Sequence, residues 1–193
     1  MGFLDTLFGR SKPAKPDLDQ LFAVPSAAIT LEAVAGFIPT GVGAVCFKAL
    51  EGGSFARLET DIAALLDADG GPAVQRSQDD FGFTWLLVQG AATDVAGLVT
   101  DLHAINSTLE NDGYGPALLC SLVTFADAAE PTRRLALVYL YKRGTFYPFA
   151  PKPGAAQQRD TALELQVRGQ LGEDLRLEPD TSRWFPVWGA PGL

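Results

Sequence analysis

The spacing of hydrophobic residues differs from segment to segment of the chain. In some segments hydrophobic and polar residues alternate, and in others hydrophobic residues recur about every 3.6 positions. The two-residue period is clearest at residues 42–50, where side chains alternate between two faces, as they do in a β-strand. Short apolar runs bounded by turn residues predict further strands. The predicted strands are residues 27–31, 42–50, 74–78, 81–88, 118–125 and 135–141.

Helical spacing marks residues 54–68 and 94–109, where apolar residues recur on one face. Residues 17–22 predict a brief helical turn. Residues 160–171 fit a helix or a strand, and we favour a helix because Gln, Glu and Arg dominate the polar positions. Residues 146–149 predict a short extended piece at a sheet edge or in a loop, because prolines in and after it remove ladder donors.

This order predicts an α+β fold, mainly an antiparallel sheet with helices packed on one face. By analogy of element order alone, it also fits the chaperone-like folds that dock partner peptides. We expect one domain over residues 17–193. Residues 1–16 stand apart as an amphipathic segment followed by a proline-rich linker at 11–16.

The amphipathic start places four apolar side chains along one side of a short helix that is marginal in water. Basic residues follow, and they favour an anionic lipid surface. Weak, reversible membrane contact is therefore predicted. The alternative is that these residues cover an apolar patch on the protein itself. The predicted membrane-contacting residues are Phe3, Leu4, Leu7, Phe8, Arg10 and Lys12.

Charge is unevenly distributed along the 193 residues, whose net charge is −8. Residues 17–130 carry 16 acidic and three basic side chains, whereas residues 131–193 carry nine basic and six acidic ones. An acidic body argues against nucleic-acid binding. Cys46 and Cys120 lie in separate apolar runs and predict buried thiols, with no metal site and no cofactor.

Catalytic chemistry has few candidates in this chain. His103 is the only histidine, and it lies within a predicted helix rather than beside an activated nucleophile. An enzyme of unrecognised type would need carboxylates from the predicted turns to converge. The residues concerned are Asp67, Asp69, Asp79, Asp80 and Asp112.

Two segments combine aromatic residues with cations or prolines, at residues 139–151 and 184–189. In an extended 146–149 segment, one face would serve the core while the other stays available to a partner. The alternative is that these aromatics close the core from the sheet edge. The predicted partner-binding residues are Lys142, Arg143, Phe146, Tyr147, Phe149, Trp184 and Trp188.

Several motifs, in this order along the chain, resemble the PspA-associated protein PspAB family. They are MGFLDTLFGR, DLDQLF, FTW, LVTDLH, YKRGTFYPFAP and WFPVWG. The resemblance spans nearly the whole chain. It implies a role beside a phage-shock-type coiled-coil protein in actinobacterial envelope-stress modules, and it brings no catalytic residues.

We therefore expect a non-enzymatic adaptor of a PspA-type membrane-stress response. Its expected partner is a PspA-like coiled-coil protein or another member of that module, and its expected location is cytoplasmic and peripheral on the inner face of the cell membrane. The alternatives are a soluble peptide- or small-molecule-binding module without a membrane role, and an unrecognised enzyme. A deep apolar pocket, together with a start of the chain that docks onto its own core, would favour the binding module.

Overall fold

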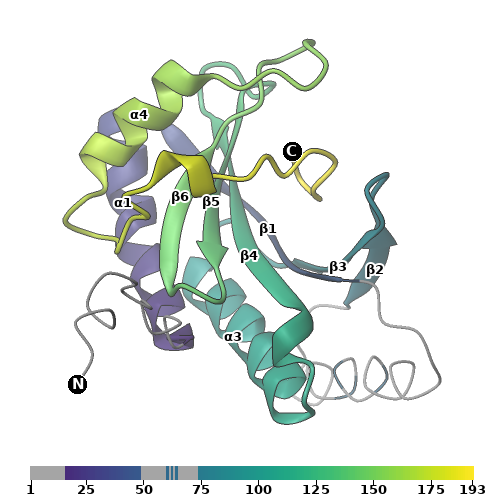
Figure 1. Ribbon diagram of the computed structural model, residues 1–193. Coiled ribbons are helices and arrows are strands. Elements are labelled where there is room, and N and C mark those ends of the chain that lie inside the picture. The colour runs from purple at the N-terminus through teal and green to yellow at the C-terminus, as the bar shows by residue number, and fades with distance from the viewer. Residues whose placement is uncertain (1–15, 49–59, 61, 63, 65–73) are drawn as a thin grey trace, which may run out of the picture.

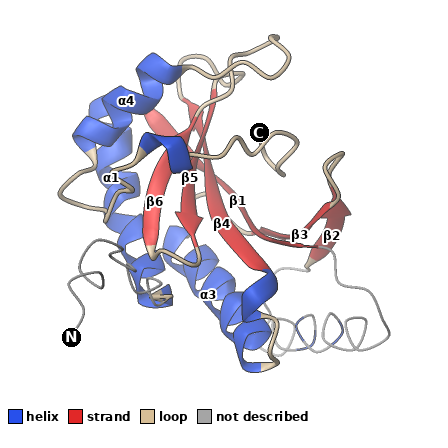
Figure 2. Ribbon diagram, viewed as in Figure 1, coloured by secondary structure: helices blue, strands red, loops and turns tan. Residues whose placement is uncertain are grey.

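A six-stranded antiparallel sheet forms the centre of the protein, in the strand order β2-β3-β1-β4-β5-β6 (Figures 1 and 2). The computed structural model describes residues 16–48, 60, 62, 64 and 74–193. The strands are β1 (Phe37–Lys48), β2 (Gln75–Gln78), β3 (Phe83–Gln89), β4 (Leu118–Asp127), β5 (Arg134–Leu140) and β6 (Thr145–Phe149). The predicted α+β class and antiparallel sheet are confirmed.

Among the residues described in full, three α-helices accompany the sheet, and they are α1 (Val24–Ala35), α3 (Val95–Asn111) and α4 (Thr161–Gln170). The predicted helices at 94–109 and 160–171 are confirmed as α3 and α4. Each begins at an aspartate whose side chain accepts a backbone N–H, from Gly97 for Asp94 and from Leu163 for Asp160. Short 3₁₀ turns lie at η1 (Leu18–Ala23), η2 (Gly115–Ala117) and η3 (Thr181–Arg183).

The strand predicted at residues 27–31 is wrong, because these residues belong to α1. The buried residues Val24, Ala27, Ala28 and Leu31 follow the i, i+3, i+4, i+7 spacing of one helix face. A proline in the first turn favours this helix, and Gly36 ends it in a left-handed conformation with φ of 70°.

β1 begins five residues before the predicted start, at Phe37, and has an irregular register between Pro39 and Gly43. Gly41 lies in that irregularity with φ of 76°, and a Cβ there would meet the Gly90 backbone oxygen at 2.4 Å. The predicted helix 54–68 lies outside the described residues except for three helical positions, of which Ile62 is buried.

The sheet separates two hydrophobic layers. On one face, α1, α3 and α4 contribute buried side chains such as Leu31, Leu102 and Val167. On the other face, the C-terminal segment contributes Trp184, Val187 and Ala190. Figure 1 shows this segment in yellow, on the opposite side of the sheet from the helices. Helices thus cover one face, and an irregular segment covers part of the other.

The stretch Leu18–Ala35, formed by η1 and α1, is long and apolar enough by length and composition to cross a membrane. Sequence analysis did not single it out. Its side chains at Leu21, Val24 and Leu31 are buried in the layer between the helices and the sheet. These contacts bury one face of the stretch, while Phe22, Ile29 and Val34 are exposed on the other.

Candidate binding site

The floor of the candidate site is a row of four side chains that crosses the sheet face opposite the helices. Trp85 of β3 is the register partner of Cys46 in β1, which pairs with Cys120 of β4, which pairs with Leu140 of β5. Register partners project from the same face of a sheet. Because two small cysteine side chains stand between a tryptophan and a leucine, the middle of this row is hollow.

A pocket of about 610 Å³ lies over this row. The C-terminal segment borders it through Phe185, Val187 and Trp188. The β2–β3 turn borders it through Asp79 and Phe81. This volume lies within the range of about 300–1,000 Å³ that small-molecule sites occupy.

Two polar groups in the pocket walls, the Trp85 indole and the Tyr147 hydroxyl, are already hydrogen-bonded inside the protein. The Trp85 indole N–H donates to Asp79 over 2.9 Å. The Tyr147 hydroxyl donates to the Phe185 backbone oxygen over 2.7 Å. A hydrogen bond with the Cys120 thiol, together with burial, raises the pKa of Cys46, so its thiol stays protonated and neutral. The interior therefore offers mainly an apolar surface.

Positive charge gathers at one end of the pocket. Four cationic side chains line it against the single carboxylate of Asp79, and they are Lys48, Lys142, Arg143 and Arg183. Lys48 ends β1, and Lys142 and Arg143 form the turn between β5 and β6. These ends meet because antiparallel strands place the end of one strand beside the start of the next. The pocket thus has a cationic end in a chain of net charge −8.

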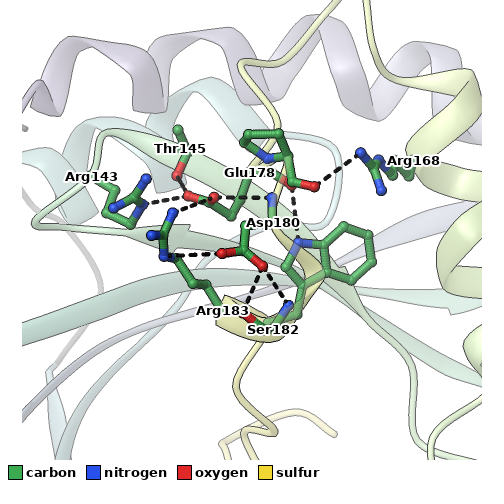
Figure 3. A network of polar contacts seen from close by, with 9 residues as sticks. Arg143, Thr145, Arg168, Glu178, Asp180, Ser182 and Arg183 are labelled. Carbon is green, nitrogen blue, oxygen red and sulfur yellow. Dashed lines mark hydrogen bonds and ion pairs between the residues drawn. The ribbon is translucent and has the colours of Figure 1, made fainter. Parts of the chain in front are cut away.

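Glu178 holds two of these cations in place (Figure 3). Its fully buried carboxylate accepts hydrogen bonds from Arg143 Nε and from the Thr145 hydroxyl, the latter over 3.0 Å. Arg183 Nη1 approaches the same carboxylate at 3.4 Å. Burial raises the pKa of Glu178, but the hydrogen bonds from Arg143, the Asp180 backbone and Thr145 outweigh it and lower the pKa overall.

The backbone beside Glu178 continues the sheet. The Glu178 N–H donates to the Phe146 oxygen over 2.7 Å, and the Phe146 N–H donates to the Arg176 oxygen over 2.9 Å. Leu177 therefore forms a parallel bridge with Phe146 on the outer side of β6. As predicted, β6 is the last strand of the sheet, but this segment covers the edge that an outside strand would use.

One prediction for the aromatic segment is wrong: both faces of β6 are buried, so neither stays available to a partner. Phe146 packs on the helix side, 5.1 Å from Tyr139 between ring centroids. Tyr147 and Phe149 lie on the pocket side, where Trp184 stacks on Tyr147 and Trp188 meets Phe149 edge to face. Phe146, Tyr147, Phe149 and Trp184 are core residues, as the alternative interpretation held.

The other predicted partner-binding residues remain accessible around the pocket. Lys142 is exposed, and Arg143 and Trp188 are half-buried. Sequence reasoning missed Phe81 and Phe185, whose exposed fractions are 56% and 61%. The sequence signal that could have indicated their exposure is a large aromatic residue next to turn-forming residues, in Asp-Asp-Phe-Gly and in Trp-Phe-Pro.

The carboxylates that an unrecognised enzyme would use do not converge where the structure describes them. Asp79 and Asp80 lie in the β2–β3 turn, while Asp112 follows the end of α3. Asp67 and Asp69 lie outside the described residues. Within residues 16–48 and 74–193, no group of three or more His, Cys, Asp or Glu side chains is placed to hold a metal ion.

The predicted membrane-contacting residues all lie outside the described residues, so their membrane contact stays a prediction. They are Phe3, Leu4, Leu7, Phe8, Arg10 and Lys12.

Comparison with known proteins matches the chain to one family. The sequence model of the family described as PspA associated protein B matches residues 1–192. The resemblance found in the sequence motifs is thereby confirmed. No curated protein and no solved structure matches the chain.

Proposed function

We propose that this chain, which belongs to the PspA-associated protein B family, is a non-enzymatic adaptor that binds a protein partner of the PspA module near the inner face of the cell membrane. The family name supports a PspA-related partner.

The observation that carries the proposal is the rim of the pocket, which we define as Phe81, Lys142, Arg143, Arg183 and Phe185. It joins two exposed aromatic side chains to three cations. Aromatic residues and arginine are the most frequent anchors of protein interfaces. The rim also brings three cations together in a chain whose net charge is −8.

This chemistry favours a partner that presents acidic side chains beside one or two apolar ones, as an amphipathic helix of a coiled-coil protein does. Positive charge on the rim would steer such a helix to this face and set its orientation. Glu178 supports the arrangement because it holds Arg143 and Arg183 in fixed positions before a partner arrives.

The proposed membrane contact rests on the amphipathic pattern of residues 3–8 and the cations that follow. Flotation with anionic liposomes tests it. The full chain should float, and a Phe3→Glu/Leu7→Glu variant should stay behind. Equal flotation of the two proteins would contradict the membrane contact and leave a cytoplasmic adaptor.

Capture of the partner tests the rim. The tagged full chain should capture the PspA-type protein of its own organism, and Phe81→Ala/Phe185→Ala should reduce capture about tenfold or more. Ile29→Ala/Leu165→Ala is the matched control, because it truncates two exposed apolar residues on helices α1 and α4, across the sheet. Capture that falls equally with both pairs, or with neither, would contradict a binding surface at the rim.

The pocket itself favours a second candidate function, a small-molecule-binding module without a membrane role. A deep apolar pocket was one of two features expected of that alternative, and the structure contains an apolar pocket of about 610 Å³. The other feature, a start of the chain docked onto its own core, falls on residues 1–15, which lie outside the described residues. The two functions are compatible on one chain, because a partner needs the rim and a small molecule needs the interior.

A further inference from the structure

We infer that the pocket is a binding site for a single acyl chain that carries an anionic head group. The inference goes beyond the proposed adaptor role, since it needs no protein partner. It rests on the polarity of the pocket interior, the charge at one end and the shape of the floor.

The interior suits a hydrocarbon better than a peptide. In the described walls, the hydrogen-bonding groups of Trp85 and Tyr147 are used by Asp79 and by the Phe185 backbone. The floor strands β3, β1, β4 and β5 each lie between two neighbours, so their backbone groups belong to the sheet ladders. A peptide backbone placed here would lose its hydrogen bonds to water without replacement, whereas an acyl chain has none to lose.

The cationic end suits an anion. Lys142 Nζ donates to the backbone oxygen of Pro116 over 2.9 Å, which is a neutral acceptor. Arg143 and Arg183 share the carboxylate of Glu178, and Arg183 also lies 3.5 Å from Asp180. Because Arg143 uses Nε for Glu178, the other nitrogens of its guanidinium are oriented by that bond and suit an incoming carboxylate or phosphate.

The floor suits a long, narrow ligand. It runs from Trp85 on β3 to Leu140 on β5, across three strand spacings, or roughly 14 Å. Its centre is hollow because cysteines occupy positions 46 and 120, where a larger side chain would fill the space. The same row therefore determines the depth of the site.

Titration of the full chain, freed of bound lipid, tests the inference through its own fluorescence. The protein has three tryptophans. Trp85 and Trp188 line the pocket, and Trp184 stacks on the pocket residue Tyr147. Laurate below its micelle concentration should bind with one-to-one saturation and change this emission. Monolaurin, which has the same acyl chain and a neutral head, should bind about tenfold more weakly or less.

A second anionic ligand distinguishes a membrane lipid from a free fatty acid as the natural ligand. Lauroyl lysophosphatidylglycerol has the same chain on a phospholipid head. Tighter binding of this lipid than of laurate would identify a membrane lipid as the natural source, and the reverse would identify a free fatty acid. Both results support the site. The absence of saturable binding for both ligands would overturn it.

Two sets of variants locate the ligand. Cys120→Leu fills the floor and should weaken laurate binding about tenfold or more, while the matched Cys120→Ala should retain it. Lys142→Gln/Arg183→Gln should weaken laurate but leave monolaurin unchanged, and Lys152→Gln, which lies outside the pocket lining, should change neither. Equal laurate affinity in Cys120→Leu and Cys120→Ala would overturn the inference.

Thiol protection provides a measurement on the unaltered protein in case Cys120→Leu does not fold. Saturating laurate should slow the alkylation of Cys46 and Cys120 by iodoacetamide, because both line the pocket. An unchanged alkylation rate at saturation would place the ligand elsewhere. Because the titrations contain no PspA-type protein, they stand or fall separately from the capture experiment.

Discussion

Cys46 of β1 and Cys120 of β4 are direct register partners, and both line the pocket on the sheet face opposite the helices. Both thiols are free and buried. Their small size makes the floor hollow, and the hydrogen bond with Cys120, together with burial, raises the pKa of Cys46. The pair therefore links the register of two central strands to the depth and polarity of the site.

We expect the Cys46 thiol to react slowly with alkylating reagents in the folded protein. The thiolate is the nucleophile, and the pKa of Cys46 is raised by its hydrogen bond with Cys120 and by burial. At pH 8, iodoacetamide should therefore modify Cys46 at least tenfold more slowly in the folded chain than in urea, as followed by mass spectrometry. Equal rates in both states would show that Cys46 is not held as a buried, neutral thiol.

Asp79 should matter far more to the pocket wall than its neighbour Asp80. Its carboxylate accepts the backbone N–H groups of Phe81 and Phe83 and the indole N–H of Trp85, each over 2.9 Å. We expect Asp79→Ala to lower the free energy of unfolding by about 2–3 kcal/mol in urea denaturation. The exposed Asp80→Ala is the matched control, with an expected change within about 0.5 kcal/mol. Similar costs for both variants would contradict this role of Asp79.

Glu178 should make stability depend on pH. Because its pKa is lowered in the folded state, its contribution is fully present above the ordinary carboxyl pKa of about 4.3 and is lost as the pH falls through its folded-state value. Glu178→Gln should therefore cost about 2–3 kcal/mol at pH 7 and progressively less below pH ~4 in urea denaturation.

Glu173→Gln is the matched control for Glu178→Gln, because Glu173 is an exposed glutamate of the same segment. It should have little effect at either pH. A cost of Glu178→Gln that stays constant with pH would mean that the charge of Glu178 does not hold Arg143 and Arg183.

Two substitutions of Tyr147 should lower stability by different amounts, because its ring and its hydroxyl have separate contacts. Tyr147→Phe removes the hydrogen bond to Phe185 and should cost about 1 kcal/mol. Tyr147→Ala also removes a buried ring that stacks on Trp184, and should cost about 3–5 kcal/mol. Hydrogen exchange should show faster opening of residues 184–188 in both variants. A melting temperature unchanged in Tyr147→Ala would contradict the core position of this ring.

Local signals in the sequence determined much of the fold. The spacing of apolar residues placed α3, and alternation placed most of β1, because these patterns arise from the geometry of single elements. For α4 the spacing fitted both periods, and the helix was predicted from the Gln, Glu and Arg at its polar positions. The prolines after β5 correctly indicated that β6 lies at the sheet edge. The same local logic failed at residues 27–31, where small apolar residues fit both periods and only the packing of Leu31 against the sheet decides for a helix.

Only the tertiary structure decided the site. The sequence identified Cys46 and Cys120 as buried thiols. Their pairing in the sheet could not be predicted, because the two residues lie 74 positions apart and the residues around each one do not specify its partner. The sequence also identified the aromatic segment at 146–149, but whether a strand face is free depends on what covers it. Here Glu178 binds Arg143, and Leu177 pairs with Phe146. These two contacts hold the C-terminal segment over the sheet. That long-range packing turned predicted surface aromatics into core, and it left the cations and the hollow row as a pocket.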